Sequence, residues 1–324
     1  TVAPLFGPRF EEVFGPTRKK GDELTQDHMD LAASVQRHCE HVIFHTLTRL
    51  HEMTGLDKVC IAGGVAQNSV ANGKITRNTP FKEVYIPSAG HDAGISMGSA
   101  QFHIHANLNA PRVAPLRLAH TGCRFTNEEG EAFLQAEGVE YIRYQSDEEL
   151  YDVVSDALVD GKVIGWFNGR AEFGPRALGG RSIIADPSRA DAKELLNSKI
   201  KRRESFRPFA PSILSEHVAD WFELDEPVPF MEKVFPIREE RKAQIPAVTH
   251  VDGSGRLQSV YKDVTPRYHA LISAFHAKSG VPILLNTSFN ENEPIVNAPE
   301  HAYACYARTS MDMLVMENCV VRRS

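Results

Sequence analysis

The sequence predicts an α/β protein of two domains. Its 324 residues are long for one domain, and 42% of them are hydrophobic, enough for two cores. A strand, a glycine turn and a helix follow one another twice before residue 106, an order typical of layered α/β folds. The stretch 106–117 contains two prolines and shows no hydrophobic period. We therefore expect domains at residues 1–112 and 113–324.

The elements of the first domain follow from hydrophobic spacing and glycine positions. Apolar residues recur at helical spacing from Asp27, and Gly55 ends the run. Short buried strands then precede Gly63-Gly64 and the segment 89–94. The expected order is helix 27–55, strand 58–62, a helix from about 65, strand 83–86 and a helix that ends near 103.

The second domain shows the same kinds of pattern with longer irregular stretches. The expected elements are helix 147–160, strand 162–167, a helix near 190–201, a mixed stretch with β-like runs, helix 268–278 and strand 281–285.

The composition limits which kinds of partner and which cellular compartment we expect for the protein. The formal charge of −6 does not favour nucleic acid or an anionic membrane as a partner. Five scattered cysteines without a CxxC pair indicate reduced thiols, and no apolar run reaches membrane-spanning length. We therefore expect a cytoplasmic protein. Because the chain begins with Thr1 and a Pro/Gly-rich stretch, we also expect it to be a piece of a longer polypeptide with an N-terminal remainder.

Two glycine-containing turns are candidate ligand sites. Gly63, Gly64 and Asn68 lie between a strand and a helix, where backbone N–H groups can contact phosphate; a plain tight turn is the favoured alternative. Asp92 follows the second strand and is a candidate metal ligand, although the residues alone favour a helix N-cap. His41 and His45 share a helix face, and we interpret them as surface residues of that helix.

Arginine and lysine concentrate in two segments, 169–182 and 197–210. Arg176 and Arg181 lie on a glycine-rich loop, and five of the nine residues in 199–207 are basic. Arginine forks fit phosphate oxygens in pairs, and lysine adds a point charge. A solvated basic face is the usual alternative. Neighbouring aromatic residues such as Phe173 and Phe209 instead indicate the wall of a pocket.

A polar turn follows the last expected strand. Residues 285–290 (Leu-Asn-Thr-Ser-Phe-Asn) offer amide and hydroxyl donors that suit a carbonyl or a phosphate. A strand-ending turn held by its own Asn and Ser bonds is an equally good interpretation.

Five strings carry a resemblance to a known family. They are AGGVAQN, GHDAG, EFGPRALGGRSI, KxRESFRPFAP and LLNTSFN, which begin at residues 62, 90, 172, 201 and 284. In this order they resemble the carbamoyltransferases that modify nodulation factors and antibiotics. The resemblance implies the C-terminal lobe of an actin-like ATPase-fold domain followed by a YrdC-like α/β domain.

The resemblance also implies a two-step reaction. ATP, with Mg²⁺, and carbamoyl phosphate give carbamoyladenylate in the YrdC-like domain. The actin-like domain then transfers the carbamoyl group to a hydroxyl-bearing small-molecule acceptor beside a divalent metal, usually Fe²⁺. A threonylcarbamoyl-AMP synthase-like enzyme of tRNA modification, and a nucleic-acid-binding module built on residues 199–207, remain the alternatives.

The resemblance assigns roles to the residues of this sequence that occupy the matching positions in these strings. The resemblance implies catalytic roles for Arg176, Lys201, Arg207, Asn286 and Ser288. It implies substrate or nucleotide contacts for Arg181, Arg203, Arg256, Thr287, Gly63, Gly64 and Asn68, and a metal contact for Asp92. The family's other metal ligands form an HxxxH pair in a part that would precede Thr1, so His41 and His45 do not receive that role.

Overall fold

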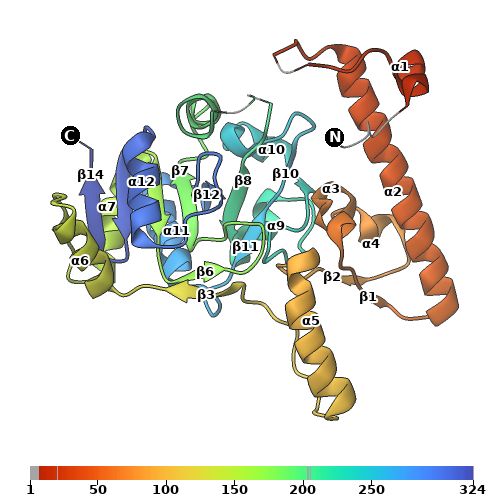
Figure 1. The fold of residues 1–324 in the computed structure, drawn as a ribbon, viewed down its shortest axis with the longest axis horizontal. Coiled ribbons are helices and arrows are strands. Elements are labelled where there is room, and N and C mark those ends of the chain that lie inside the picture. The colour runs from red at the N-terminus through yellow and green to blue at the C-terminus, as the bar shows by residue number, and fades with distance from the viewer. Residues whose placement is uncertain (1–6, 20, 203, 205, 324) are drawn as a thin grey trace. The chain divides into compact units, whose positions relative to one another are not determined.

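The computed structural model describes residues 7–19, 21–202, 204 and 206–323 (Figure 1). The chain divides into two compact units. One comprises Thr1–Asp57 with Ile75–Lys82, and the other comprises Lys58–Lys74 with Glu83–Ser324. All the predicted site residues that the structure describes belong to the second, larger unit.

The smaller unit is organised around one long helix. The helix α2 (Gln26–Thr54) ends at Gly55, whose left-handed backbone lets its N–H reach the carbonyl of His51 at 2.7 Å. This confirms the predicted helix 27–55. The unit also contains α1 (Pro8–Phe14) and α4 (Ile75–Asn78). His41 and His45 are exposed on α2, as a surface helix face requires.

The larger unit begins with two short parallel strands, β1 (Lys58–Cys60) and β2 (Glu83–Tyr85), which confirm both strands predicted there. Short helices follow each strand: η1 (Gly64–Gln67) and α3 (Ser69–Asn72) after β1, and η2 (Asp92–Gly94), α5 (Ile95–Phe102) and the π-helical η3 (His103–Asn107) after β2.

Eight of the described strands form one mixed sheet. Their order is β11-β8-β12-β7-β5-β13-β14-β4; β11/β8 and β13/β5 are parallel, and the other pairs are antiparallel. Their bounds are β4 Ile142–Arg143, β5 Ile164–Phe167, β7 Arg181–Ala185, β8 Ala210–Leu214, β11 Gln258–Val260, β12 Ile283–Ser288, β13 Met313–Met316 and β14 Cys319–Arg322.

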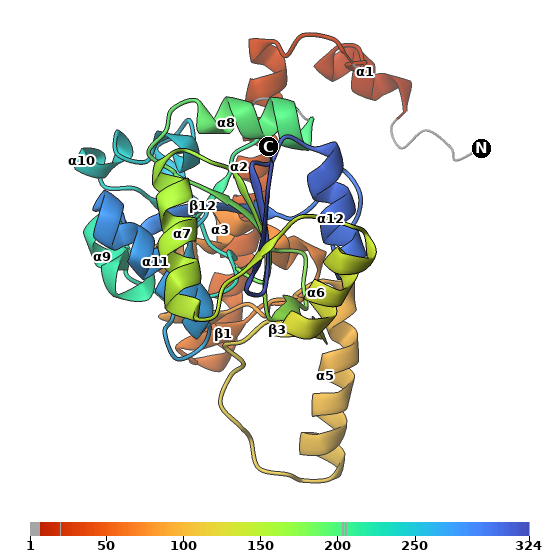
Figure 2. The same ribbon diagram turned by 90° about the vertical axis from the view of Figure 1, so that its left-hand side faces the viewer.

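Helices cover both faces of this sheet because its strands are apolar on both sides. Ile184 and Leu284 face α7 (Asp147–Val159) and α11 (Pro266–Ser279) in one core. Ile183 and Leu285 point the other way, into a core shared with α6 (Asn127–Ala136), α8 (Ala192–Leu195) and α12 (Pro299–Arg308). Figure 2 shows the two helical layers with the strands between them.

Smaller elements surround the sheet. They are the antiparallel pairs β3 (His120–Arg124) with β6 (Arg170–Glu172) and β9 (Phe235–Pro236) with β10 (Ser254–Gly255), and the short helices η4 (Leu196–Lys201), η5 (Ser215–His217), α9 (Val218–Trp221), α10 (Glu239–Lys242) and η6 (Pro246–Val248).

The fold agrees with the predicted α/β class and with the main elements of the second domain. Helices 147–160 and 268–278 and strands 162–167 and 281–285 are present as α7, α11, β5 and β12, and the helix near 190–201 is the pair α8 and η4. The boundary near residue 112 and the actin-like and YrdC-like assignments stay predictions. None of the described helices has the length and apolar character needed to cross a bilayer.

The two-sided core makes a glycine in β5 a sensitive position. A Cβ at Gly165 would lie 2.6 Å from the buried ring of Phe289, so Gly165→Ala should lower the free energy of unfolding by about 1–3 kcal/mol. Gly98→Ala in α5 has open space and should be neutral or slightly stabilising. Urea denaturation measures both. Equal stability of the two variants would contradict this packing.

Candidate functional site

We call residues 173–181 the arginine loop: they are the glycine-rich connection between β6 and β7 together with the first residue of β7. Near its start lies Gly174, whose backbone φ of 145° is a conformation that favours glycine. A Cβ at Gly174 would lie 2.5 Å from the carbonyl oxygen of Ser88. The start of the loop therefore packs backbone to backbone against the segment that follows β2.

Buried side chains satisfy the carbonyl groups of the arginine loop. Residues 177–180 accept hydrogen bonds, in chain order, from Asn286 Nδ2 at 3.2 Å, Gln258 Nε2 at 2.9 Å, Trp166 Nε1 at 2.9 Å and Arg181 Nη1 at 3.1 Å. The donors come from β12, β11, β5 and β7, so the sheet itself holds the loop.

The N–H groups of the same residues converge on one carboxylate. Glu172 Oε1 accepts from the N–H groups of Leu178, Gly180 and Arg181 at 2.6, 2.8 and 3.4 Å. The Glu172 side chain is only 4% exposed. Glu172 lies in the string EFGPRALGGRSI, but neither its residue type nor its spacing predicted a role for it.

Arg181 lies inside this arrangement. Its side chain donates to the carbonyls of Asn168, Gly169 and Cys123 at 3.1–3.2 Å and stacks over the Phe167 ring at 3.7 Å. Burial lowers the pKa of Arg181 to about 10. These contacts show that Arg181 helps to hold the loop, and the nucleotide contact implied by the resemblance stays a prediction.

Arg176 differs from Arg181 in having no hydrogen-bond or ion-pair partner among the described residues. Its side chain is half-buried, and within the described part of the chain its guanidinium forms no hydrogen bond or ion pair. Burial lowers the pKa of Arg176, and no nearby carboxylate among the described residues opposes this shift. A desolvated cation without a counter-charge is costly, so this position favours an anionic ligand.

Lys201 organises the polar turn after β12. It is 2% exposed, and its Nζ donates to the carbonyl of Ser288 at 2.5 Å and to the carbonyl and Oδ1 of Asn290 at 2.7 Å each. Ser288 Oγ lies 3.2 Å from the same ammonium and donates to Asn290 Oδ1 at 2.7 Å. The structure thus brings together Lys201 and Ser288, which the sequence motifs placed in one group.

Asn286 connects the polar turn to the arginine loop. Besides the Ala177 carbonyl, its Nδ2 donates to Ser212 Oγ at 3.0 Å, and its Oδ1 is buried without a partner among the described residues. Thr287, the next residue, pairs with Ile183 through the backbone and is half-buried.

The remaining predicted basic residues are less closely integrated. The side chain of Arg207 is exposed. Arg256 is half-buried near His250, and its charge adds to the burial that lowers the pKa of His250 to about 4. Arg203 lies outside the described residues.

The Gly63-Gly64 turn has the geometry of a tight turn. Gly63 has a φ of 103°, and its N–H donates to the carbonyl of Gly90 at 2.5 Å. Asn68 Oδ1 caps α3 by accepting from the N–H of Ala71 at 3.1 Å. Both glycines are exposed, with open space where a Cβ would stand. Nucleotide binding at this turn stays a prediction.

The segment after this turn packs on residues 230–234. The N–H of Val234 donates to the carbonyl of Ser69 at 3.0 Å, and Asn72 Nδ2 donates to the carbonyl of Glu232 at 2.9 Å. A Cβ at Gly73 would lie 2.0 Å from the Val234 carbonyl oxygen. These contacts join the glycine turn to the body that carries the arginine loop.

Asp92 is exposed in the first turn of η2. The N-cap position belongs to His91, so the interpretation of Asp92 as N-cap is wrong by one residue. Among the described residues there is no group of three His, Cys, Asp or Glu side chains that fits a metal ion. Asp92 can supply one ligand, and the described residues do not complete a metal site.

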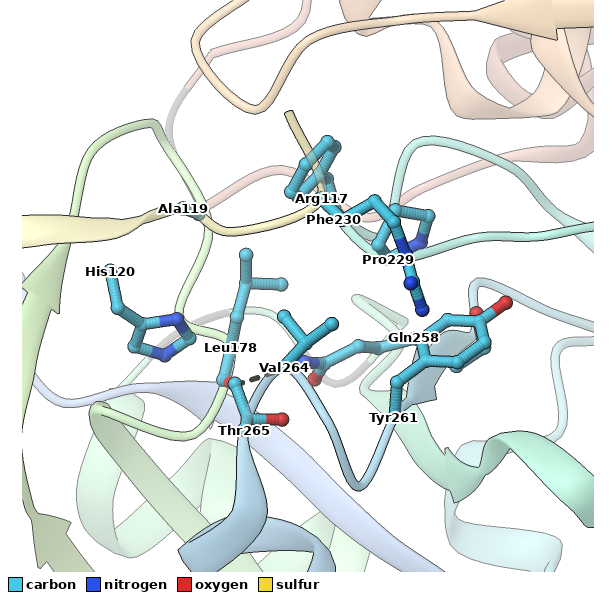
Figure 3. A pocket seen from close by; sticks show the side chains of 11 residues that line it. Arg117, Ala119, His120, Leu178, Pro229, Phe230, Gln258, Tyr261, Val264 and Thr265 are labelled. Atoms are coloured by element: carbon cyan, nitrogen blue, oxygen red, sulfur yellow. Dashed lines mark hydrogen bonds between the residues drawn. The ribbon is translucent and has the colours of Figure 1, made fainter. Parts of the chain in front are cut away.

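A small, shallow pocket opens beside the arginine loop (Figure 3). Leu178 and Gln258 form part of its wall, with the hydrogen bond between them drawn as a dashed line. His120 also lines it, and its Nδ1 is buried without a partner among the described residues. Its Nε2 lies 3.6 Å from Glu172 Oε1, while burial lowers its pKa. No motif in the sequence pointed to His120.

Removing the Lys201 ammonium tests the organisation of the polar turn. Lys201→Met should lower the free energy of unfolding by about 1–3 kcal/mol, because buried oxygens of Ser288 and Asn290 lose a charged donor. Lys162→Met, at a side chain that is 53% exposed, should change it by less than about 1 kcal/mol. Chemical denaturation measures the free energy of unfolding of both variants. Equal losses of stability in the two would contradict the role of Lys201 in holding the polar turn.

Glu232 gives the larger unit a pH dependence. Burial raises the pKa of the Glu232 carboxyl to about 7 from its ordinary 4.5. The folded state therefore holds this proton more tightly than the unfolded state does, and the folded state loses that stabilisation as the pH rises through 7. Glu232→Gln should therefore raise the melting temperature at pH 8 by roughly 2–4 °C and have a smaller effect at pH 5. Calorimetry at both pH values checks this; a larger gain at pH 5 would refute it.

Comparisons with known proteins agree with the site's motifs. The family model described as "Carbamoyltransferase C-terminus" matches residues 155–323, and "Carbamoyltransferase N-terminus" matches residues 7–101. Nodulation protein NolNO of Sinorhizobium fredii is 41% identical over 94% of this chain and 46% of its own length. Nodulation protein NolO of Bradyrhizobium diazoefficiens is 40% identical over 94% of this chain and 57% of its own.

An enzyme is among the relatives. The 3'-hydroxymethylcephem-O-carbamoyltransferase of Amycolatopsis lactamdurans is 33% identical over 84% of this chain and 51% of its own. The chain spans about half the length of the curated relatives it matches. A solved structure, full-length HypF in the phosphate- and nucleotide-bound form, shows a TM-score of 0.38 and 18% identity over 57% of this chain and 23% of its own, values too low to establish a shared fold. The matches to the two family models and to these relatives show that the chain belongs to the carbamoyltransferase family.

Proposed function

We propose that this chain takes part in ATP-dependent O-carbamoylation and that its larger unit activates carbamoyl phosphate. Membership of the carbamoyltransferase family supports the transfer of a carbamoyl group, and one relative carries an O-carbamoyltransferase name. The observation that carries the activation step is Arg176, a desolvated cation without a counter-charge among the described residues, on a loop held by buried side chains.

The proposed first step consumes one water and one ATP. Water attacks carbamoyl phosphate and breaks the bond to phosphate, which leaves carbamate and inorganic phosphate. A carbamate oxygen then bonds to the α-phosphorus of ATP, the bond to pyrophosphate breaks, and carbamoyladenylate results. Several anions must approach one another, so positioning and charge neutralisation are the main contributions of the protein.

Different residues of the chain have different roles in this step. Arg176 binds a phosphate group, and the exposed Arg207 adds a second cation on the solvent side. Lys201 and Asn286 act through the turn: Lys201 holds the backbone of Ser288 and Asn290, and Asn286 ties β12 to the arginine loop. Mg²⁺ brought with ATP would neutralise part of the negative charge of its phosphates.

The proposed second step transfers the carbamoyl group to an alcohol. The acceptor oxygen bonds to the carbamoyl carbon, the bond to AMP breaks, and the hydroxyl proton leaves to solvent. The Gly63-Gly64 turn and Asp92 are the proposed nucleotide and metal contacts of this step. Asp92 would supply one ligand to Fe²⁺, and the described residues do not complete a site for that ion.

Release of AMP tests the proposal. The complete polypeptide should release AMP when carbamoyl phosphate and ATP are both present. Arg176→Met should lower kcat/KM by about a hundredfold, because a desolvated charge contact is lost. Arg207→Ala should also lower it. Arg112→Ala, in the exposed linker, serves as the control.

The outcomes separate the proposed function from its alternatives. Failure of the wild type to release AMP, or unchanged release by Arg207→Ala, would refute carbamoyl-phosphate activation. AMP formation from threonine and bicarbonate in place of carbamoyl phosphate would instead favour the threonylcarbamoyl-AMP synthase class. Steeply salt-dependent RNA binding through residues 199–207 would favour the nucleic-acid-binding alternative.

A further inference from the structure

We propose that Glu172 is a positioning residue of the phosphate site: it holds the backbone of the arginine loop and thereby places the guanidinium of Arg176. This inference rests on the proposed function for the identity of the substrate. The physical claim, that Glu172 sets the phosphate affinity of Arg176 through the loop, can be tested without any turnover.

Glu172 fills a backbone site that is built for an anion. Three N–H groups within four residues point at its Oε1, a convergence of donors that binds anions in other proteins. The side chain is 4% exposed, so water cannot replace it cheaply. A charged acceptor strengthens each of these hydrogen bonds relative to a neutral one.

The position of Glu172 is fixed from its own strand. β6 pairs with β3, and Glu172 lies opposite His120 in that register. The loop closes tightly over the carboxylate: a Cβ at Gly180 would lie 3.1 Å from Glu172 Oε2 and 2.6 Å from the Arg170 carbonyl oxygen. Glu172 and the loop are therefore packed as one unit.

Arg176 depends on this unit because its side chain has no anchor among the described residues. Its backbone lies between Gly174, packed against Ser88, and residues 177–181, which Glu172 and the sheet hold. Leu178, the first residue that Glu172 binds, is only two positions away. Release of the N–H groups of residues 178, 180 and 181 would let the Arg176 backbone explore other conformations before an anion binds. That lost preorganisation lowers affinity without removing a ligand contact.

Glu172→Gln is the decisive variant because it keeps the size of the side chain and an acceptor oxygen while removing the charge. Glu172→Ala removes the acceptor as well. Glu317→Gln is the matched control: Glu317 is 7% exposed, accepts from the N–H of Gly169 at 2.6 Å and pairs with Arg267, but forms no hydrogen bond with the described residues 176–181. All three variants remove a buried carboxylate.

Three measurements on the complete polypeptide test the role. Amide hydrogen exchange reports the backbone of residues 177–181, calorimetric titration with inorganic phosphate reports the anion affinity, and thermal melting reports overall stability. We expect Glu172→Ala to raise exchange in 177–181 and the Kd for phosphate by about tenfold each, the loss expected from one charge-assisted hydrogen bond. Glu172→Gln should fall between wild type and Ala. Glu317→Gln should melt at a lower temperature with its phosphate Kd unchanged.

The activity assay then distinguishes this inference from the proposed function. In an active enzyme, Glu172→Gln should raise the KM for carbamoyl phosphate several-fold more than the KM for ATP. A phosphate Kd that stays at the wild-type value in Glu172→Gln, or an absence of phosphate binding in the wild type, overturns the inference. Unchanged exchange in residues 177–181 overturns it too. Absence of AMP release with these binding and exchange effects intact refutes only the proposed function.

Discussion

The larger unit depends on one constraint: the buried backbone of the arginine loop has to be paired with side chains from other elements. Glu172 takes its N–H groups, while Asn286, Gln258 and Trp166 take its carbonyls. Because these groups are buried, the loss of any one partner leaves a polar group without water or protein to bind. The loop is consequently held by hydrogen bonds to the sheet below it, as a loop that carries the proposed site requires.

Arg176 and Arg181 lie close together in the sequence but differ in burial and in hydrogen-bond partners, and therefore in role. Arg181 directs its guanidinium to buried carbonyl groups beneath the loop and is almost fully buried itself. Arg176, five positions earlier, is desolvated and lacks a counter-charge among the described residues. Lys201 resembles Arg181 in this respect, because its ammonium holds the turn at Ser288 and Asn290. Cations that look equivalent in the sequence thus divide into one without a partner among the described residues and two whose charged groups bind protein oxygens.

Local patterns predicted much of the fold and part of the site. Helical spacing located α2, α7 and α11, and short apolar runs located β1, β5 and β12, because these signals lie within each element. The strands β13 and β14 were not predicted, since their apolar runs have no glycine or proline punctuation as clear as that near Gly63. The helix α12 was also missed, although Pro299 marks its start. Motifs grouped Lys201 with Ser288 but did not reveal Glu172 and His120. The structural role of Arg181 was also missed, since its partners are set by strand pairing and not by spacing in the chain.

The contact between Gly174 and Ser88 limits how far the two proposed steps can lie apart. Arg176 is two residues beyond Gly174, and Asp92 is four residues beyond Ser88. With about 3.8 Å between consecutive Cα atoms, the Cα atoms of Arg176 and Asp92 lie within roughly 30 Å of each other. The close backbone approach at Gly174 keeps this separation from growing, and a side chain there would push the two segments apart. In the proposed two-step reaction, the sites of activation and transfer would therefore lie no more than about 30 Å apart, a limit that depends on the glycine at position 174.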